Sequence, residues 1–79
     1  MVRLSEKEVV ILRFIRRSRH KTTAAEIALG LHISRNEVEA FVQGMVNRKL
    51  LNVARGTPPY EDAYYTNPEM REEIFALIG

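Results

Sequence analysis

Apolar residues in the first half of the chain recur every three or four positions, the spacing of one face of an α-helix. Ser5, Thr23 and Ser34 each stand before such a run, and each has Glu three residues later, which is the sequence of a capping box. Together the spacing and the caps predict three helices, at about residues 5–19, 23–31 and 34–48.

The pattern changes after residue 49. Residues 50–55 alternate and favour a strand, and the turn signal Gly56-Thr57-Pro58-Pro59 follows. Residues 62–66 resume the strand pattern, so the sequence predicts a β-hairpin over about residues 50–66 with a loop of about six residues. Asn67 then caps a last helix at about residues 68–78, with Pro68 at its first position.

The first and last helices carry more apolar surface than a single core requires. Val10 and Phe14 widen the apolar sector of the first helix to roughly 200°. Either a second element covers this sector or a partner chain does. One interpretation is a homodimer, whose interface residues would be Val10, Phe14, Ile74, Phe75 and Ile78. In the alternative, the last helix packs on the first helix of its own chain.

Composition limits the class of protein. The 79 residues, 46% apolar and 28% charged, suffice for one domain over residues 1–79, and the predicted elements make it α+β but mostly α. The chain has no Cys, and its two His are twelve residues apart, so we expect no disulfide, metal or cofactor. No nucleophile, base and orienting group occur together, so we expect no enzyme. No long apolar run or leader is evident, which favours a cytoplasmic protein.

Charge is unevenly distributed along the chain. Residues 1–22 carry a net +5, residues 23–55 a net +1 and residues 56–79 a net −4, for a total of +2. This asymmetry suggests one face that attracts a polyanion. The alternative is that basic and acidic helices simply solvate different sides of the molecule.

Residues 23–38 carry the most specific signal. Two short helices meet at the turn His32-Ile33-Ser34, with Ala28 small where the helices would cross. This is the spacing of a helix-turn-helix. The order of three helices, two strands and a helix resembles the winged-helix family, particularly small prokaryotic and archaeal transcription regulators, over about residues 4–66. His32 and Lys49 stand where the family often has Gly, and a left-handed backbone is expected at His32.

The resemblance implies binding of double-stranded DNA, with helix 34–48 in the major groove. The expected base contacts are Arg35, Asn36, Glu39 and Gln43. The expected contacts to the DNA backbone are Thr22, Thr23, Ser34, Asn47, Arg48, Lys49, Arg55 and Thr57. The hairpin tip is acidic, so we expect it to touch the sugar-phosphate edge weakly, through Arg55, Thr57 or Tyr60, or not at all.

Two alternatives remain open at this point. The run from Arg16 to Lys21 either stabilises the end of the first helix through its dipole or contacts the DNA backbone. The whole domain is either a sequence-specific DNA-binding regulator, acting as a dimer, or a winged-helix module that joins a protein assembly without reading DNA. The polar face of the third helix and the basic amino-terminal third favour the first; the modest net charge and the acidic hairpin favour the second.

Overall fold

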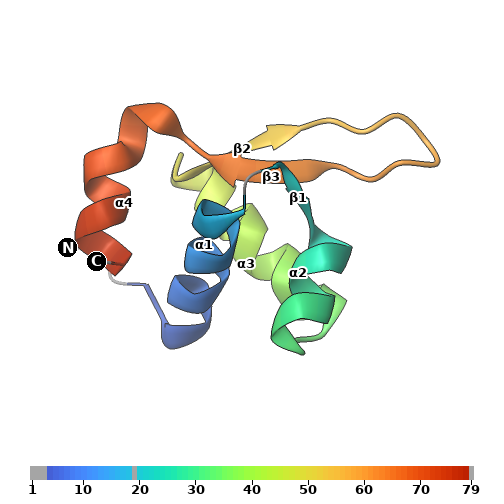
Figure 1. Ribbon diagram of the computed structural model, residues 1–79, viewed down its shortest axis with the longest axis horizontal. Coiled ribbons are helices and arrows are strands. Elements are labelled where there is room, and N and C mark those ends of the chain that lie inside the picture. Colours follow the sequence, from blue (N-terminus) through green and yellow to red (C-terminus); the bar gives the residue numbers. More distant parts are fainter. Residues whose placement is uncertain (1–3, 19, 79) are drawn as a thin grey trace.

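A computed structural model describes residues 4–18 and 20–78 of the chain. The described elements are α1 (Glu6–Arg17), β1 (Thr22–Thr23), α2 (Ala24–Leu31), α3 (Arg35–Asn47), β2 (Leu51–Ala54), β3 (Ala63–Thr66), the 3₁₀ helix η1 (Pro68–Met70) and α4 (Arg71–Ile78). The first three helices lie along one side of the sheet, α4 stands beside α1, and the loop between β2 and β3 extends away from the helices (Figure 1). The predicted α+β fold, with a three-helix core, a hairpin and a C-terminal helix, is confirmed.

Capping boxes begin α1 and α2, as predicted. The Ser5 hydroxyl accepts a hydrogen bond from the Glu8 backbone N–H at 3.3 Å, and the Glu8 carboxylate accepts one from the Ser5 N–H at 3.0 Å. Thr23 and Glu26 make the same reciprocal pair at 3.2 and 3.1 Å. Backbone N–H groups that a helix start would leave without partners are satisfied in this way.

The third predicted box is only half formed. The Ser34 hydroxyl accepts from the Glu37 N–H at 3.2 Å, so it caps α3 as expected. The Glu37 carboxylate turns instead to the ammonium of Lys7 on α1, at 2.8 Å. A charged donor makes a stronger hydrogen bond with a carboxylate than a neutral N–H does, which explains the choice. The contact joins α1 to the first turn of α3.

Left-handed residues end α2 and α3. His32 has φ 56° and ψ 42°, as the sequence predicts, and Lys49 has φ 65°. After α3, the N–H of Lys49 donates to the Val46 carbonyl at 2.9 Å and the N–H of Leu50 to the Met45 carbonyl at 3.0 Å. These bonds satisfy carbonyls at the end of the helix and turn the chain toward β2.

The first helix ends earlier than its predicted limit. α1 stops at Arg17, and the Ser18 N–H bonds to the carbonyls of Phe14 and Ile15. Arg19, where the predicted helix ends, lies outside the described residues. The last predicted helix begins as η1 and continues as α4.

Strand β1 is absent from the sequence-based prediction. Thr22 and Thr23 pair antiparallel with Tyr64 and Ala63, so the sheet order is β1-β3-β2. Strands β2 and β3 pair in the register Leu51↔Thr66 to Ala54↔Ala63, which leaves residues 55–62 as a loop longer than predicted. A strand of two residues is too short to produce alternation in the sequence, because its pairing depends on β3, which lies forty residues further along.

Helices and sheet share one core. It contains Ile11, Leu12 and Ile15 of α1, Ala24 and Ile27 of α2, Val38, Val42 and Met45 of α3, Leu50, Leu51, Ile74 and Ile78. Ile74 and Ile78 are each 2% exposed within the single chain, so these two residues are not available to the predicted dimer interface. The guanidinium of Arg13 also holds the end of α4, donating to the Ile78 carbonyl at 2.7 and 3.1 Å.

Phe14 is partly covered within its own chain. Its ring lies so close to Gly30 of α2 that a Cβ built there would be 2.6 and 2.8 Å from two ring carbons. Gly30 therefore permits a close approach of α2 to α1. Of the two residues that widen the apolar sector of α1, Phe14 therefore packs against α2, whereas Val10 remains 42% exposed.

Candidate nucleic-acid interface

The outward face of α3 is open. Val38, Val42 and Met45 point into the core, and the opposite side of the helix is exposed at Arg35, Asn36, Glu39, Ala40, Gln43 and Asn47. All four residues predicted to contact bases therefore share one exposed face. Within it, the Gln43 amide donates to the Asn47 side-chain oxygen at 3.4 Å.

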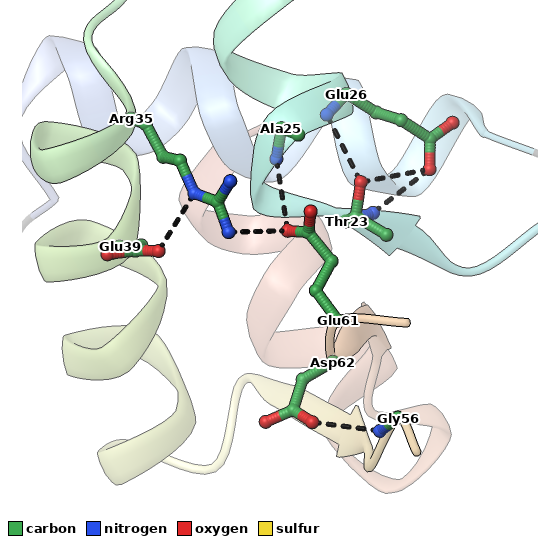
Figure 2. A network of polar contacts seen from close by, with 8 residues as sticks. All are labelled: Thr23, Ala25, Glu26, Arg35, Glu39, Gly56, Glu61 and Asp62. Carbon is green, nitrogen blue, oxygen red and sulfur yellow. Dashed lines mark hydrogen bonds and ion pairs between the residues drawn. The ribbon is translucent and has the colours of Figure 1, made fainter. Parts of the chain in front are cut away.

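Arg35 is held by two carboxylates (Figure 2). Its Nε donates to Glu39 Oε1, one turn along α3, at 3.1 Å. Its Nη2 donates to Glu61 Oε1, from the loop between β2 and β3, at 3.2 Å. The Arg35 side chain remains 53% exposed, so solvent still reaches the guanidinium.

The base of the loop directs Glu61 toward the helices. The Asp62 carboxylate accepts from the Gly56 N–H at 2.8 Å and pairs with Arg55 at 3.3 Å. A Cβ at Gly56 would overlap the Glu61 backbone carbonyl, so only Gly allows the two sides of the loop to approach this closely. Glu61 then extends between α2 and α3, where it also accepts from the Ala25 N–H at 3.4 Å (Figure 2).

The other predicted DNA-contacting arginines are paired too. Arg48 lies 3.6 Å from Glu8 of α1, a carboxylate that is only 13% exposed, and so faces α1 at the end of α3. Arg55 is 82% exposed but lies 3.3 Å from Asp62. Lys49, beside Arg48, is exposed. Each predicted arginine contact is therefore balanced by a carboxylate of the same chain.

The charge near α3 also acts on Tyr64 of β3. Burial raises the pKa of this phenol, and the carboxylates of Asp62, Glu39 and Glu61 raise it further, against a smaller opposite effect of Arg55. A phenolate would be repelled by this surrounding negative charge. The ion pairs of Arg35 with Glu39 and Glu61, and of Arg55 with Asp62, make the first turn of α3 and the base of the loop a charge-balanced surface rather than a positive one.

The hydroxyl groups predicted to contact phosphate are mostly engaged. Thr22 is 1% exposed and its hydroxyl donates to the His20 carbonyl at 3.3 Å, so the prediction for Thr22 is wrong. The residue belongs to β1 and faces the core. The hydroxyls of Thr23 and Ser34 serve as helix caps. Thr57 is exposed on the loop.

Exposed apolar side chains lie elsewhere on the molecule. Val10 is 42% exposed and Phe75 64% exposed, while the Phe14 ring is partly covered by Gly30. Val10, Phe14 and Leu31 line a hollow between α1 and the end of α2, with Arg13 and Arg17 also lining it. Of the five predicted dimer residues, Val10, Phe14 and Phe75 are thus accessible in part.

Glu61 is the site residue that the sequence-based prediction did not assign. Its acidity is plain from the sequence, but its contact with Arg35 joins positions 26 residues apart and has no local signal. Closure of the loop by Gly56 and Asp62 is equally non-local.

Among residues 4–18 and 20–78, no group of three His, Asp or Glu side chains is arranged to hold a metal ion. In the same part of the chain, no helix has the length and apolar character needed to cross a membrane. Neither the models of known protein families nor the curated proteins searched give a match to this sequence.

Proposed function

We propose that this protein binds double-stranded DNA in a sequence-dependent way and acts as a transcription regulator of the winged-helix type. The observation that supports this most strongly is the exposed polar side of α3, which continues for more than three turns from Arg35 to Asn47. A helix of this length and polarity fits the major groove of B-DNA.

In this proposal, the side chains of the open face read base edges. The Arg35 guanidinium has the two-pronged geometry that matches guanine, and the amides of Asn36 and Gln43 match adenine. Glu39 holds Arg35 from the same face and so sets the direction of its guanidinium. Backbone contacts are assigned to Lys49, Arg55 and Thr57, whose side chains are exposed.

DNA must take the place of an internal carboxylate to reach Arg35. Glu61 lies on the guanidinium at 3.2 Å, and its −1 charge would repel an approaching phosphate. The pair is substantially exposed, with 53% of the Arg35 side chain and 32% of the Glu61 side chain accessible, so its net strength is small. Exchange of Glu61 for a base edge or a phosphate therefore costs little free energy.

A two-fold dimer would present two copies of α3 to successive major grooves. Val10 and Phe75 supply exposed apolar surface for it, with Phe14 at the edge. Because the resemblance is to prokaryotic and archaeal regulators, whose chromosomes lie in the cytoplasm, we assign the proposed activity to that compartment.

Titration of random duplex DNA by gel shift, at about 50 and 200 mM salt, tests DNA binding, followed by selection of preferred sites. We expect binding to weaken steeply with salt, because phosphate contacts release counterions. Arg35→Ala and Gln43→Ala should relax the preference among sequences, whereas Arg55→Ala should weaken all sequences equally. No shift with micromolar protein at 50 mM salt would overturn the proposal.

The charge balance of this surface supports a second candidate, a protein-interaction module. Arg35, Arg48 and Arg55 each face a carboxylate, and Phe75 is 64% exposed on α4. A protein-interaction module would not bind DNA in the gel-shift titration. It would instead bind a protein through the exposed apolar residues of α1 and α4. The gel shift above distinguishes the two candidates.

A further inference from the structure

Positive charge that is not balanced by carboxylates gathers at the end of α1. The three arginines of the α3 side are ion-paired, as described above. Arg16, Arg17 and Lys21 make no ion pair with any residue that the structure describes. Arg13, Lys49 and Arg71 also have none there, but Arg13 donates to the Ile78 carbonyl, and Lys49 and Arg71 lie apart from each other in the sequence, at the end of α3 and the start of α4. The largest concentration of unbalanced charge is therefore not on the proposed reading helix.

Two of these cations line an open hollow. Arg16, His20 and Lys21 are its exposed members, and Ile15, Ser18, Tyr65 and Thr66 are its buried or half-buried members. The hollow has a volume of about 610 Å³ and opens broadly to solvent, so it is a surface for an extended partner rather than an enclosed site for a small molecule.

The hollow is a different surface from the outward face of α3. Its lining comes from α1, the connection to β1 and strand β3, with no contribution from α3 among the described residues. Neighbouring residues of a strand point to opposite sides of a sheet. Tyr64 packs against the core, and Tyr65, the next residue, lies under Lys21, whose ammonium is 5.4 Å from the centre of the ring.

One carboxylate lies next to the hollow. Glu26 of α2 is 3.1 Å from His20, and its other oxygen accepts hydrogen bonds from Thr23. Arg16 and Lys21 are not partners of Glu26. Their two positive charges therefore remain available to an anion that lies across the hollow.

We propose that this hollow, defined by Arg16, Lys21 and Tyr65, is a second DNA-binding surface that holds the sugar-phosphate backbone. Two cations beside a half-buried aromatic ring suit a regular polyanion, because each cation can meet a phosphate while a sugar or base covers the ring. The apolar lining residues are buried or half-buried, so the hollow offers no large side chain for insertion into a lipid surface. This surface acts independently of reading by α3, and its contacts carry no sequence information.

The salt dependence of binding to a random duplex tests the proposal. Arg16→Gln and Lys21→Gln each remove one exposed cation of the hollow, and Arg71→Gln is the matched control because it removes one exposed cation from α4. Each hollow variant should lower the slope of log affinity against log salt by about 0.9, and the double variant by about twice that. Arg71→Gln should leave the slope unchanged. Lys21→Arg should keep the wild-type slope, because it retains the charge beside Tyr65.

The outcomes separate this proposal from the one for α3. Wild-type slopes in both hollow variants, with folding shown to be intact by circular dichroism, would overturn the hollow alone. Lower slopes in the hollow variants, with Arg35→Ala identical to wild type in both affinity and preference, would support the hollow and overturn reading by α3. Loss of binding to phosphatidylserine vesicles in the hollow variants, with DNA binding unchanged, would mean that the partner is a membrane and would overturn the proposal. Absence of DNA binding by the wild-type chain would overturn both.

Discussion

Arg35 and Glu61 join the first turn of α3 to the loop between β2 and β3, through a guanidinium nitrogen 3.2 Å from a carboxylate oxygen. Through this contact the acidic loop covers part of Arg35, the arginine on the outward face of α3 that is proposed to contact bases. Exposed ion pairs contribute up to about 1 kcal/mol, so this contact is weak enough to open when DNA approaches. Glu61 therefore sets how readily Arg35 can be reached.

Removal of the Glu61 charge should strengthen DNA binding. We expect Glu61→Gln to raise affinity for duplex DNA by about threefold to tenfold. The variant lacks the ion pair that competes with DNA for Arg35, and it lacks the negative charge that repels a DNA phosphate. Fluorescence anisotropy with a labelled duplex at fixed salt measures the change. Glu72→Gln is the control, since it removes the same charge from an exposed position on α4. Equal gains in the two variants would mean that only net charge matters and that the Arg35 contact has no part in binding.

Gly30 and Gly44 should respond in opposite ways to substitution by Ala. A Cβ at Gly44 meets nothing within 4 Å, so Gly44→Ala should raise the free energy of unfolding by about 0.5–1 kcal/mol through better helix propensity. A Cβ at Gly30 would lie 2.6 Å from the Phe14 ring. Displacement of that ring costs about 1–3 kcal/mol and exceeds the propensity gain, so Gly30→Ala should destabilise the fold by about 1 kcal/mol.

Urea unfolding followed by circular dichroism measures both glycine variants under identical conditions. A similar gain in stability for Gly30→Ala and Gly44→Ala would show that α2 does not approach Phe14 as closely as the structure has it.

The substitution Lys49→Gly should stabilise the folded protein. Its φ of 65° is a left-handed conformation, which costs an ordinary L-residue about 1–2 kcal/mol and costs Gly almost nothing. Part of this gain is lost because Gly makes the unfolded chain more flexible, so the expected net increase in the free energy of unfolding is about 0.5–1 kcal/mol. Thermal unfolding measures the change, with Lys49→Ala as the control that keeps a Cβ. Should Lys49→Ala stabilise the protein as much as Lys49→Gly, the backbone conformation would not be the cause.

Local signals in the sequence were sufficient for most elements of this fold. Ser5, Thr23 and Ser34 mark helix starts because a cap depends on residues only three positions away. His32 marks the turn between α2 and α3 for the same local reason. Helix limits agree with the prediction to within one or two residues, and the hairpin is found at the predicted place.

Features that depend on distant partners could not be predicted in the same way. Strand β1 exists because Thr22 meets Tyr64, and Ile74 is buried because α4 turns back onto α1. In the sequence, Glu61 is one of several acidic residues, and its contact with Arg35 is evident only in the folded loop. The candidate site was thus predictable as a set of exposed residues on α3, but its charge balance was not.

Acid should weaken the start of α2 through Glu26. The pKa of this carboxyl is lowered from its ordinary value of 4.5, chiefly by the hydrogen bond from the Thr23 backbone N–H and next by the contact with His20. A group whose pKa is lower in the folded state stabilises the fold above its unfolded pKa, and this contribution disappears as pH falls through the lowered pKa. The effect of Glu26 is therefore fully present at neutral pH and fades below about pH 4.5. Melting temperatures of wild type and Glu26→Gln should differ at neutral pH and converge on acidification. A gap between wild type and Glu26→Gln that stays constant down to about pH 3 would mean that the ionised carboxylate does not stabilise the cap.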